Sequence, residues 1–363
     1  MRSGLWGTVP DVSSFQPSAE DWKQVLRIAK EQTVIGLVAE GAALCPSGFV
    51  PEAVGLRLIG LCESIRRRNA QTNSVIASLV ALFAEDGIPL FLLKGQGVAC
   101  CYLKPELRMP GDIDLFVLPE DYQQSKKTLS KIGVRDEGEG LDKLHYGAMH
   151  GDLEIEIHGT VHTSLGNRIN GCLDEMQREL FESESSRSLE CTGKDGSVRI
   201  KLPSPDFDAL FIFIHLLQHF FCGGLGLRQL CDWARLLHCY RDSVDVPKLE
   251  ARLKRMGVTS EWKAFMSFIV NYLSLPEEDA ILLDRGCEAK ARRIWRYVEM
   301  VGNFGTKIRR RDRTRDPYLI RKVQSFVINS KCFLVHIAIF PLDSLKFFWG
   351  YFTTGMRAVI HGE

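Results

Sequence analysis

The sequence of 363 residues predicts an α+β protein in which a small mixed β-sheet core is flanked by an N-terminal and a C-terminal helical region. Two short apolar runs, IPLFLL at 88–93 and DIDLFVL at 112–118, predict strands because turn residues separate them. Alternating apolar and polar residues in DLEIEIH, at 152–158, predict a third strand. We expect three parts, which are helical residues 1–80, a core with an insertion at 81–200, and helical residues 201–363.

The composition is that of an ordinary soluble globular protein, with 45% apolar and 25% charged residues. A formal charge of +1 gives no global attraction to nucleic acid or to an anionic membrane, although KIRRRDRTR at 307–315 is a local basic run. No apolar run reaches the ~18 residues that span a bilayer, and no signal-peptide core occurs near the N-terminus. The 11 cysteines show no regular framework and no CxxC pair, which favours reduced core thiols in a cytoplasmic protein.

Helices are predicted on both sides of the core. Residues 18–40 begin with a serine cap and repeat apolar residues at helical spacing. A longer helix is predicted from Pro51 to Gly87, where the triple arginine at 66–68 fits a solvated face better than a nucleotide or acidic partner. A shorter helix is predicted at 121–133. After the core, residues 204–221 predict a buried apolar helix, and helical patterns continue to residue 299.

Two segments of the core are predicted to be irregular. Residues 134–144 are polar and glycine-rich, which indicates a loop or a short strand leading into one. Residues 164–200 contain an acidic, serine-rich segment followed by the turn Gly193-Lys194-Asp195-Gly196, which predicts a hairpin or an exposed insertion.

The clearest chemistry lies between the first two predicted strands. Lys94-Gly95-Gln96-Gly97 follows the first strand, and Asp112 and Asp114 open the second. Side chains two residues apart on a strand point to the same face, so the two carboxylates converge. Such a pair suits Mg²⁺, which is held by one or two carboxylates and by phosphate oxygens of its substrate. The glycines would let backbone N–H groups approach an anion, and Lys94 would add positive charge.

The stretch LLKGQGVACCYLKPELRMPGDIDLFV at 92–117 resembles a bacterial family of uncharacterised nucleotidyltransferases within the DNA polymerase β-type superfamily. The resemblance is strongest over 88–162 and looser over 205–240. It implies a nucleotidyltransferase core whose nucleotide-binding residues are Lys94, Gly95, Gln96, Gly97 and Arg108. The superfamily's usual Gly-Ser is replaced here by Lys94-Gly95, a departure that affects the expected contacts with the triphosphate.

The same resemblance implies a third metal-binding carboxylate on a neighbouring strand. The family's acid–apolar–histidine motif corresponds to Glu156-Ile157-His158, so Glu156 is the expected ligand and Glu154 is the alternative. A polar edge strand that faces solvent is the competing interpretation. The family's Arg-x-x-x-Asp passage corresponds to Arg228 and Asp232, which fit a phosphate contact or, equally, a surface ion pair.

Other catalytic constellations are less specific. His215 and His219 have the i,i+4 spacing of a zinc motif, but Leu216 stands where a metalloprotease needs glutamate, so a buried hydrogen-bonded pair is favoured. The sequence contains no Gly-x-Ser-x-Gly elbow, P-loop or Gly-x-Gly-x-x-Gly motif.

We therefore expect a nucleotidyltransferase, dependent on Mg²⁺ or Mn²⁺, that moves a nucleoside monophosphate from an NTP to an acceptor hydroxyl and releases pyrophosphate. Asp112, Asp114 and Glu156 would bind the metal and carry catalysis, and Glu156 is also a candidate proton acceptor. The sequence identifies neither the base of the NTP nor the acceptor, a small molecule or a protein. The alternative is a regulatory or antitoxin-like module that binds nucleotides or proteins on the same fold with little turnover.

Overall fold

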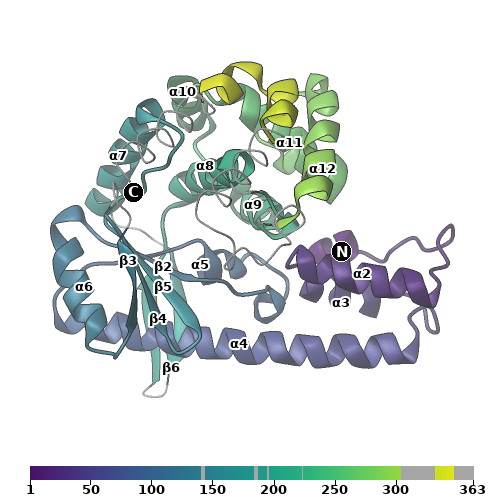
Figure 1. Cartoon of the computed structure of the whole chain (residues 1–363), viewed down its shortest axis with the longest axis horizontal. Coiled ribbons are helices and arrows are strands. Elements are labelled where there is room, and N and C mark those ends of the chain that lie inside the picture. Colours follow the sequence, from purple (N-terminus) through teal and green to yellow (C-terminus); the bar gives the residue numbers. More distant parts are fainter. Residues whose placement is uncertain (140–143, 184–186, 194–195, 223, 304–331, 347–363) are drawn as a thin grey trace, which may run out of the picture.

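A seven-stranded mixed sheet lies between a long N-terminal helix and a layer of C-terminal helices in the computed structural model (Figure 1). The structure describes residues 1–139, 144–183, 187–193, 196–222, 224–303 and 332–346, so the basic run at 307–315 lies outside the described residues. The predicted α+β class is confirmed. None of the helices within these ranges is long and apolar enough to cross a membrane.

The N-terminal region is helical, as predicted, but its first helix is divided. Ser18 caps α2 through a reciprocal capping box with Asp21, and the helix stops before Thr33, whose φ of 54° is left-handed. The long predicted helix from Pro51 is confirmed as α4, which runs beneath the sheet (Figure 1). The bounds of the four helices are α1 Arg2–Trp6, α2 Ala19–Glu31, α3 Ile35–Ala43 and α4 Glu52–Glu85.

The sheet has the strand order β3-β4-β5-β2-β1-β7-β6. Strand β2 pairs antiparallel with β1 and parallel with β5, so these three strands form its centre. The strands are β1 Phe91–Leu93, β2 Ile113–Phe116, β3 Arg135–Glu139, β4 His145–His150, β5 Leu153–His158, β6 Ser188–Gly193 and β7 Gly196–Lys201. Between them lie helices α5 Gly95–Ala99, α6 Tyr122–Ser130 and α7 Asn167–Glu182, and 3-10 turns η1 Pro105–Leu107 and η2 Pro119–Asp121.

One part of the core agrees with the sequence interpretation, and one part differs from it. The segment at 134–144, predicted as a loop or a short strand, contributes β3 to a hairpin with β4. The hairpin predicted near Gly193 is confirmed as β6–β7, but the amphipathic helix α7 ahead of it was not predicted. Its buried side with Leu173, Met176 and Leu180 has helical spacing, which the acidic residues around it obscure.

The two faces of the sheet are covered by different helices. One face, with Leu92, Leu115 and Ile155, packs against residues of α4 and α6. The other face, with Phe91 and Phe116, belongs to the larger core built mainly from the C-terminal helices. Both faces of the central strands are therefore buried, apart from the polar residues described below.

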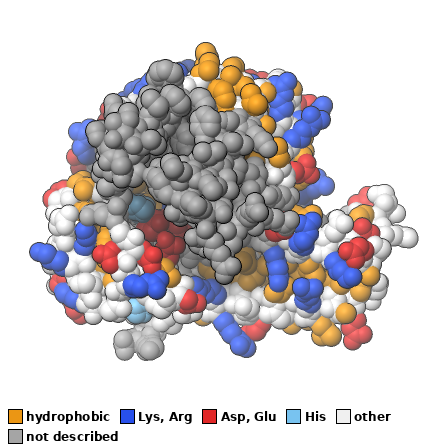
Figure 2. Space-filling view, in the orientation of Figure 1, with side chains coloured by type: hydrophobic (Ala, Val, Ile, Leu, Met, Phe, Trp, Pro, Cys, Tyr) orange, Lys and Arg blue, Asp and Glu red, His pale blue; other side chains and the backbone are white. Residues whose placement is uncertain are grey.

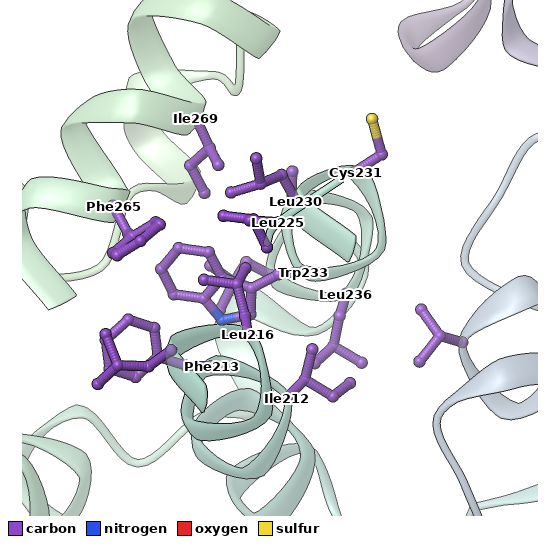
Figure 3. Packing of buried hydrophobic residues seen from close by; sticks show 14 of the residues in the cluster. Ile212, Phe213, Leu216, Leu225, Leu230, Cys231, Trp233, Leu236, Phe265 and Ile269 are labelled. Atoms are coloured by element: carbon purple, nitrogen blue, oxygen red, sulfur yellow. The ribbon is translucent and has the colours of Figure 1, made fainter. Parts of the chain in front are cut away.

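The C-terminal layer packs around aromatic side chains. Phe213 and Leu216 of α8 meet Trp233 of α9 and Phe265 of α11 (Figure 3). The predicted apolar helix at 204–221 is thus confirmed as α8 and is buried along most of its length. The helices are α8 Pro205–Cys222, α9 Leu227–Tyr240, α10 Val246–Met256, α11 Thr259–Leu273 and α12 Glu288–Val301, with 3-10 turns η3 Arg241–Ser243, η4 Glu277–Asp279 and η5 Arg285–Cys287.

Stability should fall as the pH rises, because of one carboxyl group in this layer. Glu261 of α11 is 1% exposed, and burial together with the proximity of Asp343 raises its pKa to about 8. A carboxyl group whose pKa is raised on folding contributes its full stabilisation below its unfolded pKa. That stabilisation is lost as the pH rises through the folded pKa and the group ionises. Between about pH 5 and 8, we expect urea denaturation to show a decline of up to about 4 kcal/mol in the free energy of unfolding. Glu261→Gln should flatten this slope, and an equal slope in the variant would contradict the assignment.

Candidate functional site

The central strands place polar residues on the sheet face that is turned toward the C-terminal helices. Strands β2 and β5 run parallel, with Asp114 opposite Glu156 and Phe116 opposite His158. Because neighbouring residues of a strand face opposite sides, Ile113 and Leu115 pack into the core on the α4 side while Asp114 faces the other way. The register therefore brings an aspartate, a glutamate and a histidine to one face.

Asp112, Asp114 and Glu156 come together at this point. Each offers an oxygen, and these oxygens all lie within 4.8 Å of one another. Asp114 is only 1% exposed, and its Oδ2 atom is buried without a hydrogen-bond partner among the described residues. Repulsion from Asp114, together with burial, raises the pKa of Asp112. The site thus offers only oxygen ligands, one of which is buried without a partner, and it carries excess negative charge. These features fit a divalent cation such as Mg²⁺.

Glu154, the alternative third carboxylate, lies apart from this group. Its side chain is exposed, and it lines a neighbouring pocket that includes Arg68 and Asp152 and shares Asp112 with the site. Arg68 of the triple-arginine segment forms an ion pair with Asp152, and Arg67 pairs with Glu63 on the helix surface. The arginines at 67 and 68 thus have acidic partners on this chain, in line with the interpretation of a solvated helix face.

Lys94 supplies the positive charge nearest to the carboxylates. Its Nζ atom lies 2.9 Å from Asp114 Oδ1 and 3.5 Å from His215 Nε2. Burial opposes its charge, but the three carboxylates outweigh this effect and raise the pKa of Lys94, so it stays protonated. The residue has a left-handed φ of 48°, which costs a non-glycine residue about 1–3 kcal/mol. This turn aims the side chain from the end of β1 into the site.

Of the other predicted nucleotide-binding residues, Gly95 and Arg108 line the pocket, whereas the structure does not place Gln96 or Gly97 on its wall. The amide of Gln96 donates to Asn69 at 2.9 Å and to Asn73 at 3.0 Å on α4. A side chain at Gly97 would press on Leu202. These two residues therefore fix the turn to its surroundings.

Arg108 is held by a buried carboxylate. It is 5% exposed, and its Nε and Nη2 atoms donate to the two oxygens of Asp232 at 2.8 and 2.7 Å. Tyr102 also donates to Asp232, at 2.6 Å. Of the two interpretations of Arg228 and Asp232, the surface ion pair is therefore wrong, because α9 packs with this side against the loop that carries Arg108.

Arg228 instead binds the backbone beside Asp112. Its Nη1 atom donates to the carbonyls of Met109 at 3.1 Å and Pro110 at 3.2 Å. A Cβ atom at Gly111 would lie 3.3 Å from the guanidinium, so glycine permits this close approach. Arg228 also lines the pocket, which leaves a cation at the wall next to the carboxylates.

Five histidines line the pocket around the carboxylates, namely His145, His158, His162, His215 and His219. The Nε2 atom of His158 lies 2.9 Å from Asp114 Oδ1, and its ring stacks on that of His145 from β4 at a centroid distance of 4.7 Å. The predicted hydrogen-bonded pair on α8 is confirmed, since the Nε2 atoms of His215 and His219 lie 2.9 Å apart. Burial and the charge of Lys94 lower the pKa of His219 to about 4, so this histidine is neutral near pH 7.

The sequence did not identify His145 as part of the site, because it follows a polar loop without a motif of its own. His215 and His219 were recognised only as a pair, although two polar residues in an apolar helix indicate a polar surface opposite them. Glu156 contacts both His145 and His158. Burial disfavours its ionised form, but these imidazoles lower the pKa of Glu156, so the carboxylate stays charged.

The three carboxylates, Lys94, Arg228 and the histidines line one pocket of about 360 Å³ between the sheet and helices α8 and α9. Its walls also include Thr160, Thr163 and Gln218. On the face shown in Figure 2, acidic side chains gather in a recess with a histidine beside it. The pocket is thus large enough for a small-molecule ligand and carries both charges needed to bind a metal–phosphate group.

Comparison with known proteins identified a family. The family model described as an uncharacterised nucleotidyltransferase matches residues 18–273. A solved structure entitled "Solution Structure of Antibiotic-Resistance Factor ANT(2'')-Ia Reveals Substrate-Regulated Conformation Dynamics" is 15% identical, with 53% of this chain and 94% of that chain covered at a TM-score of 0.35. A score this low supports no inference. No curated protein matches the sequence.

The buried Arg108–Asp232 pair should contribute strongly to stability. Asp232→Asn would leave the Arg108 charge buried without its counter-ion, so we expect a loss of about 3–5 kcal/mol in the free energy of unfolding. Tyr102→Phe removes only one hydrogen bond and should cost roughly 1–2 kcal/mol. Glu63→Gln breaks the exposed pair with Arg67 and is the control, with an expected change below about 1 kcal/mol. Equal losses in the three variants, measured by urea denaturation, would refute this ranking.

Proposed function

The chain belongs to the uncharacterised nucleotidyltransferase family, and we propose that it transfers a nucleoside monophosphate from an NTP to an acceptor hydroxyl, with Mg²⁺ or Mn²⁺ as cofactor and pyrophosphate as the second product. The observation that carries the proposal is the convergence of Asp112, Asp114 and Glu156 beside the charged Lys94 in one pocket. A pure scaffold gains nothing from such a cluster, because burying several carboxylates together destabilises a fold.

Asp112, Asp114 and Glu156 are the residues that would hold the cofactor. When bound, divalent ions of this kind stabilise the charge on the attacking and leaving oxygens of a phosphoryl group. The lowered pKa of Glu156 keeps it ionised, which makes it a good ligand and a poor proton acceptor. We therefore assign Glu156 first to cofactor binding, and its role as a proton acceptor stays a prediction.

Lys94 and Arg228 would neutralise the triphosphate. Lys94 stays protonated beside the carboxylates, and Arg228 is fixed next to Gly111 by two backbone carbonyls. Cations held in place before the reaction stabilise the charge that develops on departing pyrophosphate without reorganising during the step. Gly95, on the pocket wall without a side chain, would allow the phosphates to approach the backbone.

The acceptor would bind against the neutral part of the pocket wall. Thr160, Thr163 and Gln218 line the pocket with groups that can donate and accept hydrogen bonds. His219 adds a neutral imidazole, because its pKa is lowered to about 4. These groups favour an acceptor that presents hydroxyls over one that carries a strong charge.

Asp112→Asn is the test of this function. With Mg²⁺, α-labelled NTPs and cell extract as the source of acceptors, the unaltered chain should transfer label and release pyrophosphate. We expect Asp112→Asn to reduce transfer by more than about 10²-fold, since even substitutions next to a metal ligand cost up to that factor. Glu154→Gln, a change to an exposed carboxylate outside the cluster, is the matched control and should remain within about twofold.

The alternative of a binding module with little turnover makes the opposite prediction. It requires nucleotides to raise the melting temperature of the protein while no pyrophosphate appears with any of the four NTPs. It also requires Asp112→Asn and Glu154→Gln to behave alike in the transfer assay. Either outcome, with both variants folded by circular dichroism, would overturn the catalytic proposal.

A further inference from the structure

We propose that His145, Glu156 and His158 form a second metal site, selective for a transition-metal ion of the zinc class, next to the oxygen cluster. One ring nitrogen of each histidine and one Glu156 oxygen lie within 4.8 Å of one another. Two imidazoles and a carboxylate from adjacent antiparallel strands are a donor set found in catalytic zinc and related sites, which leave one position for water or a substrate oxygen. This proposal does not depend on nucleotidyl transfer.

The distances fit a common ion. Glu156 Oε2 lies 3.1 Å from His145 Nε2 and 3.3 Å from His158 Nε2. A tetrahedral ion with bonds of ~2.0–2.1 Å separates its ligand atoms by about 3.3 Å. The three atoms can therefore meet one ion with small side-chain adjustments. The strand register supports this arrangement, because His145 pairs with His158 and Gly147 pairs with Glu156 across β4 and β5.

The contact between His145 and Glu156 lacks good hydrogen-bond geometry. The Nε2 atom of His145 is buried and has no hydrogen-bond partner among the described residues, despite its proximity to Glu156. Here an imidazole nitrogen points at a carboxylate oxygen without forming a hydrogen bond. A cation bound between the two atoms would explain this arrangement. His158 does have a partner, Asp114 at 2.9 Å, and a bound ion would replace the proton shared by those two groups.

The two donor sets differ in the ion that they select. Asp112, Asp114 and Glu156 offer only oxygens, which suits Mg²⁺, whereas the imidazoles of His145 and His158 favour zinc-class ions over Mg²⁺. Glu156 belongs to both sets, so occupancy of the two sites is coupled through one carboxylate. A zinc-class ion bound here would lie within the same pocket as the proposed nucleotide.

The test is metal binding by the full-length chain after treatment with a chelator. Zn²⁺ is titrated calorimetrically, and Co²⁺ is titrated as a probe with visible absorption, both with excess Mg²⁺ to fill the oxygen cluster. We expect saturable Zn²⁺ binding and a Co²⁺ spectrum typical of imidazole ligands. His145→Ala should weaken binding by at least about 10²-fold, because it removes a direct ligand. His238→Ala, at a similarly exposed histidine, is the control and should bind like the unaltered chain, since the side chains of His145 and His238 are 33% and 39% exposed.

Asp112→Asn separates this site from the oxygen cluster. Asp112 is absent from the imidazole set, so the variant should lose nucleotidyl transfer and still bind Zn²⁺ within about threefold of the unaltered chain. The proposal is overturned if millimolar Co²⁺ shows no saturable binding, if His145→Ala binds as tightly as His238→Ala, or if Asp112→Asn abolishes binding. Because His145 is partly exposed, its replacement should leave the far-ultraviolet circular dichroism unchanged.

Discussion

The parallel pairing of β2 with β5, in the register that sets Asp114 opposite Glu156, is the constraint on which the site depends. A shift of one residue in either strand would turn its carboxylate into the apolar layer against α4 and α6. The apolar neighbours Ile113, Leu115, Ile155 and Ile157, each 0–1% exposed, hold the register because a slip would bring them into the polar pocket. The same hydrophobic packing that stabilises the sheet thus orients its chemistry.

The pocket concentrates negative charge that the fold only partly compensates. Lys94 adopts a strained backbone conformation to reach Asp114. Arg228 donates hydrogen bonds to the carbonyls of Met109 and Pro110, close to Asp112. Even so, the Oδ2 atom of Asp114 remains without a partner among the described residues, and the pKa of Asp112 is raised by its neighbour. Strain and unsatisfied polar atoms of this kind are tolerated where a ligand later uses them. The arrangement is therefore better explained by binding than by stability.

The sequence predicted the local elements of the site better than their surroundings. Periodicity and turn residues were enough for β1, β2, β5, α4 and α8, because each has a strong pattern of its own. Strand β3 is polar and α7 is acidic, so neither stands out from a loop in the sequence. The role of Asp232 was misjudged, since the i,i+4 spacing with Arg228 is local whereas its true partner, Arg108, lies 124 residues away. His145 was missed for a related reason, because only the pairing of β4 with β5 brings it to Glu156.

The long helix α4 also contributes to the pocket from behind. Asn69 accepts a hydrogen bond from the side-chain amide of Gln96 and donates hydrogen bonds to the carbonyls of Glu106 and Arg108. One residue of this helix therefore holds both the turn after β1 and the loop before β2. Helix α3 packs against α4, and α1 packs against α3. With 34 residues, α4 is about 50 Å long. It therefore connects the N-terminal helices with the two segments that Asn69 holds. A displacement of α4 would therefore disturb both segments that carry Lys94 and Asp112 into the pocket.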